Sequence, residues 1–209
     1  MYESKEPVEA FNFVSNRLCL DFSNTLHDRN TETARDHFNT YADLVWWSKE
    51  ANILGAEETQ PLLEEAQRHP EEAALVLRDA VALREAIYRI FAALFRENSP
   101  EGADLQILNR AYAEAMGRAC IVQQGDIFSW DWKGKETALE RMLWDIVRSA
   151  AELLVSQDLP LVRECASEDC GWLFLDSSKN HSRRWCDMKG CGNRAKVGRH
   201  YEKTQRKHT

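Results

Sequence analysis

The chain has 209 residues and 44% hydrophobic side chains, which is enough for one medium domain and a small appendage. It contains no apolar run of about eighteen residues, so we expect no transmembrane helix. Its first residues lack the apolar core of a secretory signal, so we expect a cytoplasmic protein with reduced thiols. The net charge is −7. Residues 179–209 hold ten Lys and Arg against two acidic residues, a charge of +8, which leaves −15 for residues 1–178.

This charge asymmetry bears on the partner of the protein. An acidic body repels nucleic acid, whereas a basic end is typical of segments that bind a polyanion. The alternative is a basic terminus that is merely solvated.

The first predicted element is a helix over Arg17–Leu26, capped by Ser15 or Asn16. Three polar residues lie beside its apolar face: Asp21, Asn24 and Thr25. We interpret them as forming caps and hydrogen bonds between helices, and a small-molecule pocket is the alternative. The next segment, residues 27–37, is polar and is expected to be a solvated loop. It lacks the helical pair of histidines that would favour a metal site.

Helices are predicted for most of residues 40–116. Thr40 and Asp43 have the spacing of a capping box, and the helix that they open is expected to end before Gly55. The next helix is expected to have Thr59 as its cap and Pro61 in its first turn. A long helix from Glu71 to about Arg96 is apolar around much of its circumference, which is typical of the centre of a bundle. Another helix is predicted from the Ser99-Pro100 cap to Met116.

Residues 119–132 predict a β-hairpin, because two β-branched and aromatic runs flank a glycine turn. In its second strand Phe128, Trp130 and Trp132 alternate with polar residues. This row favours core packing, and a ligand-binding shelf around Trp130 is the alternative. A last helix with a continuous apolar stripe is expected from about Glu136 to Ser156, followed by a linker over Gln157–Pro160.

Four cysteines dominate the C-terminal quarter: Cys165, Cys170, Cys186 and Cys191. They form two pairs with the same internal spacing, which indicates a four-thiolate site for one structural zinc ion. Disulfides or unrelated buried thiols are the alternative, which a reducing compartment disfavours. A short strand after the first pair and a helix after the last ligand predict a treble-clef plan. The closed ligand set leaves no position for a catalytic water.

The helix predicted after Cys191 has a basic outer face. Together with the two arginines before Cys186, it supplies the candidate nucleic-acid contacts: Arg183, Arg184, Asn193, Lys196, Arg199, His200 and Lys203. Arg194 falls with Val197 on the opposite face. We therefore expect Arg194 to be structural, paired with a carboxylate such as Asp176.

Two motifs carry a family resemblance. Cys-x4-Cys-Gly-Trp-Leu-Phe-Leu-Asp176 followed by Arg184-Trp-Cys-x4-Cys-Gly-Asn-Arg194 resembles the CGNR zinc-finger family. Leu18-Cys-Leu-Asp-Phe-Ser-Asn-Thr-Leu26 resembles the start of the ABATE domain that commonly precedes it, although Ser23 stands in place of an aliphatic residue. The resemblance implies a stress-induced bacterial transcription regulator. It also implies that the four cysteines bind zinc and that Asn193 and Arg194 are motif residues.

We therefore expect a mainly helical protein with one β-hairpin. Residues 1–158 are interpreted as an ABATE-like domain that senses a small molecule or holds a homodimer, and residues 161–209 as a zinc module that binds DNA. Motion across the linker is one way to couple the two. The alternatives are an RNA-binding zinc protein and a protein-interaction module. An enzyme with a pocket in the N-terminal domain is disfavoured, because the sequence shows no nucleophile–base pair and no phosphate loop.

Overall fold

The computed structural model describes residues 11–197. Its centre is a short helix, α1 (Leu18–Ser23), which packs against the long helix α4 (Pro70–Phe95) and against α6 (Met142–Leu154). Every residue of α1 after Leu18 is buried. The helix is shorter than the predicted Arg17–Leu26, because the chain turns at Asn24 and continues into a strand. Because α1 is enclosed on all sides, its polar groups must find partners inside the protein.

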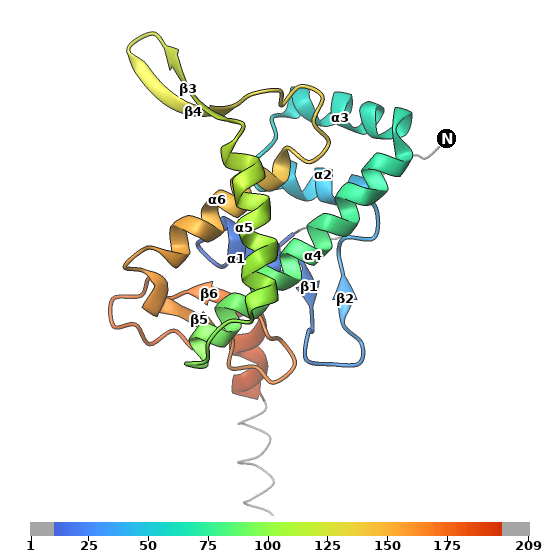
Figure 1. Cartoon of the computed structure of the whole chain (residues 1–209). Helices are drawn as coiled ribbons and strands as arrows, with labels where there is room; N and C mark the ends of the chain where they lie inside the picture. The colour runs from blue at the N-terminus through green and yellow to red at the C-terminus, as the bar shows by residue number, and fades with distance from the viewer. Residues whose placement is uncertain (1–10, 198–209) are drawn as a thin grey trace, which may run out of the picture.

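Three further helices pack against α4 (Figure 1): α2 (Tyr41–Glu50), α3 (Ala56–Arg68) and α5 (Gly102–Met116). The capping box at the start of α2 is confirmed, with the Thr40 hydroxyl accepting from the Asp43 N–H and the Asp43 carboxylate accepting from the Thr40 N–H. The mainly helical fold class is also confirmed.

The predicted starts of three helices are wrong. Helix α3 begins before Thr59, because the Gly55 N–H donates to the Glu58 carboxylate at 2.7 Å and Pro61 then lies inside the helix. Helix α5 begins at Gly102, after Glu101 as its cap. Helix α6 begins at Met142 rather than near Glu136, because the Arg141 guanidinium donates to the Lys135 and Glu58 carbonyls and so holds the preceding segment in a non-helical path.

The strands form three antiparallel pairs. Strands β1 (Leu26–His27) and β2 (Arg35–Asp36) have two residues each. They pair with each other at the two ends of the segment that we expected to be a loop. Strands β3 (Ala119–Gln124) and β4 (Ile127–Trp132) form the predicted hairpin, which projects from the helical body (Figure 1). Strands β5 (Val162–Glu164) and β6 (Leu173–Leu175) belong to the C-terminal module.

Strand β6 lies between two hydrophobic cores and contributes side chains to both. Leu173 and Leu175 pack into the large helical core, whereas Phe174 packs with Trp172 and the four cysteines in a second core. Successive side chains of a strand point to opposite faces, so three residues serve both cores. The helical body and the C-terminal module therefore share one structural element.

The predicted linker is packed rather than free. Asp158 accepts a hydrogen bond from Arg17, and residues Leu159–Leu161 form a 3-10 helix, η1, whose two leucines pack against the large core. Arg96 of α4 forms an ion pair with Glu164 of β5. The described residues thus offer no loose hinge at Gln157–Pro160, contrary to the motion that we considered there. Among the same residues, no helix combines the length and apolar character that crossing a membrane requires.

Candidate metal centre

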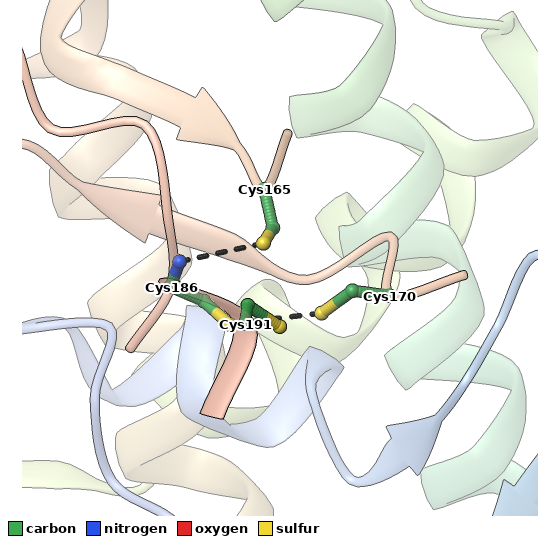
Figure 2. A group of neighbouring side chains, drawn as sticks. All are labelled: Cys165, Cys170, Cys186 and Cys191. Carbon is green, nitrogen blue, oxygen red and sulfur yellow. Dashed lines mark hydrogen bonds between the residues drawn. The ribbon is translucent and has the colours of Figure 1, made fainter. Parts of the chain in front are cut away.

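Four cysteine side chains converge between β5, β6 and the C-terminal helical turns (Figure 2). Cys165 follows β5, Cys170 precedes β6, and Cys191 lies in a short π-helix, η2 (Met188–Gly192). All four sulfur atoms lie within 4.8 Å of one another, and Cys186 Sγ is 3.6 Å from both Cys170 Sγ and Cys191 Sγ. A tetrahedral zinc with bonds of about 2.3 Å holds its sulfurs roughly 3.8 Å apart. The predicted site for one structural zinc ion is confirmed.

The surroundings of two of the four sulfurs, those of Cys165 and Cys191, favour thiolates. The backbone N–H of Cys186 donates to Cys165 Sγ at 3.4 Å, and the Arg194 guanidinium donates to Cys191 Sγ at 3.1 Å. Hydrogen bonds from the other three cysteines, with help from Arg194, lower the pKa of Cys191, and contact with Cys170 lowers the pKa of Cys165 to about 7. Proximity to these groups raises the pKa of Cys170 and of Cys186. Zinc, when bound, holds all four as thiolates.

The first knuckle is covered by the helical body. Gly171 has a φ of +67°, and a Cβ there would lie 3.1 Å from Asn30 Oδ1 and 3.3 Å from Arg29 Cβ. Asn30 donates from its amide side chain to the Glu168 carbonyl at 3.1 Å. Trp172 donates from its indole nitrogen to the Leu26 carbonyl at 3.2 Å. The loop between β1 and β2 therefore closes over the zinc module. This contact between the loop and the first zinc knuckle was not predicted from the sequence. Gly171, directly after Cys170, is the residue that could have indicated it.

Asp176 and Arg194 make separate contacts, so the pairing that we predicted between them is wrong. The buried Asp176 carboxylate accepts from the Ser178 hydroxyl at 2.6 Å and from the Arg183 N–H at 2.9 Å, which closes the turn between them. Arg194 instead bonds the sulfur of Cys191. Val197, on the face that we expected to be inward, is 55% exposed. The structural role of Arg194 is thus the support of a ligand.

Arg183 is also placed differently from our expectation of a phosphate contact at an exposed edge. Its guanidinium donates to the carbonyls of Val14 and Trp185 at 2.9 and 3.0 Å and to that of Cys186, and it lies 4.3 Å from the Phe174 ring centroid. These contacts join the N-terminal segment to the third zinc ligand. We infer that Arg183 has a structural role and holds the backbone of the zinc module in place through these hydrogen bonds.

Three of the candidate nucleic-acid contacts are exposed in the described residues: Arg184, Asn193 and Lys196. The helix after Cys191 covers residues 193–197 of the described chain and begins where η2 ends. Asn193 is tethered by a hydrogen bond from its side-chain amide to the Lys189 carbonyl at 3.1 Å. Arg199, His200 and Lys203 lie outside the described residues.

The candidate ligand residues of the N-terminal domain are not brought together. Asp21 is buried, and its Oδ1 accepts from the N–H groups of Val14 and Ser15 at 3.0 and 2.9 Å. Burial raises the pKa of Asp21 to about 6. Thr25 donates to the Phe22 carbonyl, whereas Trp130 stands on the projecting hairpin. The contacts support our structural interpretation of this cluster.

Asn24 has the most informative contacts of that cluster. Its amide nitrogen donates to the Leu173 carbonyl at 2.8 Å, and its amide oxygen accepts from the Leu173 N–H at 2.9 Å. The side chain thus pairs with β6 as a neighbouring strand would. It connects α1 directly to the strand that separates the two cores.

Comparison with known proteins agrees with these two parts. A model of the ABATE family, described as "Putative stress-induced transcription regulator", matches residues 16–157. A model of the CGNR zinc finger matches residues 162–204. Neither description is that of an enzyme. No curated protein matches the chain.

Proposed function

We propose that this chain, which belongs to the ABATE family and carries a CGNR zinc finger, regulates transcription by binding DNA through the helix that follows its last zinc ligand. Zinc folds the module by joining Cys165 and Cys170 to Cys186 and Cys191. The ligand Cys191 then fixes the start of the helix that carries Asn193 and Lys196.

The observation that carries the proposal is the exposed basic end on a zinc-anchored helix. Lys196 and Asn193 are exposed on this helix, and residues 179–209 carry a charge of +8. The remaining residues carry −15, so the charge of the chain favours the approach of a polyanion to this end. Lys196 neutralises a backbone phosphate, whereas the amide of Asn193 is suited to base edges.

The proposed interface combines described and undescribed residues. Arg184 and Lys196 are exposed and contact phosphates, and Arg199, His200 and Lys203, which lie outside the described residues, are proposed as further contacts. Arg183 donates hydrogen bonds to backbone carbonyls of the protein, so we do not count it among the residues that contact DNA. Residues 1–158 serve as the sensing or dimer-forming unit of a cytoplasmic, nucleoid-bound protein induced by stress.

The test is retention of genomic DNA fragments by the zinc-loaded protein near physiological salt, followed by sequencing. We expect one enriched motif. Lys196→Glu should weaken binding about tenfold and lower the salt slope by about one phosphate contact, because a charge that neutralises a phosphate is reversed. Lys133→Glu is the matched control, since it makes the same charge change at an exposed position of the acidic body.

Zinc content separates a lost contact from a lost fold. Lys196→Glu should keep one zinc per chain, as the control does. If fragments are retained without a motif, the DNA-reading function is contradicted and only a polyanion-binding tail remains. If RNA displaces duplex DNA, an RNA-binding protein is favoured. If Lys196→Glu binds as tightly as the wild type, the basic helix is not the interface, and a protein-interaction module replaces it.

A further inference from the structure

The hairpin of β3 and β4, which we call the arm (residues 119–132), leaves the helical body and carries a large exposed apolar surface (Figure 1). Ile121, Ile127, Phe128 and Trp130 are 60%, 72%, 66% and 61% exposed. Ile121 pairs with Trp130 and Gln123 with Phe128, so Ile121, Phe128 and Trp130 share one face. Exposed apolar surface of this extent marks an interaction site in soluble proteins.

The base of the arm is held firmly. Trp132 packs against Trp144 of α6 at 5.6 Å between ring centroids, and its indole nitrogen donates to Asp145 at 3.2 Å. Asp131 forms an ion pair with Lys135 at 2.6 Å. The arm therefore projects in a fixed direction, and its apolar residues are presented to a partner without a large ordering cost.

A groove of about 640 Å³ opens beside the point where the arm begins. It runs between α4, α5 and α6, and we call it the groove. Its apolar floor is formed by Val76, Leu83, Ile107, Leu143, Trp144 and Val147. At its rim Arg118, the residue before β3, forms an ion pair with Glu140 at 3.3 Å. The arm points away from the helical body (Figure 1), and no residue of the arm lines the groove.

We propose that two copies of this chain exchange arms, so that the arm of each lies in the groove of the other. The six-residue strands of the arm are each about 20 Å long. Two such arms placed antiparallel around a two-fold axis bring the tip of each, with Ile127 and Phe128, to the Trp144 end of the partner's groove. The contact is closed and self-complementary, as a two-fold dimer requires.

The available area favours exchange over simple contact of two arms. At about two-thirds exposure, the four apolar side chains present on the order of 450 Å² per chain. Two arms facing each other would bury roughly 900 Å², which is below the range of stable interfaces. Two arms in two grooves bury the arms and the smaller groove surfaces that receive them, roughly 1,300 Å², which lies within the range of stable interfaces.

The charges disfavour other occupants. The arm contains two Asp and neither Lys nor Arg, and residues 1–178 carry −15. An anionic membrane surface or a nucleic acid would therefore be repelled from this side. A second copy carries the same net charge, but its groove offers the arm an apolar floor, which a membrane surface or a nucleic acid does not.

The test is the molar mass of the zinc-loaded full chain by sedimentation over a wide concentration range. We expect a reversible dimer. Phe128→Ser combined with Trp130→Ser should weaken it about 30-fold or more, as hot-spot aromatics do. Both residues are exposed, so the fold should survive. Leu75→Ser with Val155→Ser is the matched control, because these exposed apolar residues lie outside the arm and the groove.

A second variant separates exchange from contact between arms. Ala82 is an exposed residue of the groove, and Ala82→Glu places a charge there that an arriving arm would desolvate. Ala82→Glu should weaken the dimer about as strongly as the arm variant does, whereas a dimer held by contact between two arms would not change. A monomeric wild type, a dimer that survives the arm variant, or a dimer that survives Ala82→Glu would each overturn the proposal. Binding of the wild type to anionic vesicles in place of self-association would overturn it as well.

Discussion

At the scale of single residues, Asn24 connects the two cores through one side chain. Its amide pairs with both backbone groups of Leu173, and all these groups are buried. We expect Asn24→Ala to lower the free energy of unfolding by about 2–4 kcal/mol, because it leaves a buried N–H and a buried C=O without partners. Asn39→Ala, at an exposed position, should cost no more than about 0.5 kcal/mol. Urea unfolding of both variants checks this, and equal costs would contradict it.

Asp21 makes a prediction about pH. Burial raises the pKa of its carboxyl to about 6 in the folded protein, above the value of about 3.9 expected in the unfolded chain. A group whose folded pKa is raised contributes stability at low pH and loses it as the pH rises through that pKa. The cost of ionising Asp21 therefore builds up between about pH 4 and about pH 6 and is constant at higher pH.

Asp21→Asn should remove this cost and keep both hydrogen bonds, because one oxygen accepts them. We expect the stability of the variant relative to the wild type to grow by about 1–1.5 kcal/mol between pH 5 and pH 8. The zinc site is the same in both proteins, so its own pH dependence cancels in the difference. Denaturant unfolding at several pH values measures it, and a constant difference would show that burial does not shift this group.

At the scale of elements, the contact between the β1–β2 loop and the first zinc knuckle depends on Gly171. We expect Gly171→Ala to destabilise the protein by about 2–3 kcal/mol, since the methyl group meets Asn30 and Arg29 at 3.1–3.3 Å in addition to a positive φ. Gly125→Ala is the matched control, because that residue has a φ of +61° and open space around it. It should cost only about 1 kcal/mol. Thermal unfolding of the pair isolates the contact.

The zinc module makes a second prediction at this scale. Cys170→Ser removes one of four ligands and should lower zinc content well below one per chain, because a structural site requires its full set. Cys120→Ser, at a half-exposed cysteine of the arm, should retain one zinc. Metal analysis measures the zinc content of both variants. Full zinc binding by Cys170→Ser would contradict the assignment of the site.

At the scale of the whole molecule, the shared strand β6 should make unfolding cooperative. Loss of zinc loosens Phe174 on one side of β6, and Leu173 and Leu175 on the other side belong to the large core. We expect zinc release, followed with a metal indicator, and loss of helix, followed by circular dichroism, to have coincident midpoints in urea. Zinc release well before the helices unfold would show that the module is an independent unit.

Sequence patterns formed by neighbouring residues predicted several secondary-structure elements of this protein. The capping box of Thr40 and Asp43 and the β-hairpin of residues 119–132 depend on residues that are close in sequence, so they could be read directly. The starts of α3 and α6 could not, since Glu58 and Arg141 satisfy backbone groups through side chains whose targets depend on the fold. The same limit explains Arg183, whose carbonyl partner at Val14 is far away in the chain.

The sequence alone determined the zinc ligands, the family and the helical class, because paired cysteines and apolar periodicity are local patterns with one dominant structural solution. Only the tertiary structure decided that Asn24 pairs with Leu173, that the β1–β2 loop closes on Gly171, and that the aromatics of the arm face solvent. Each of these depends on which surfaces meet when distant segments pack. Packing of that kind is set by the shape and hydrogen-bonding needs of the whole chain.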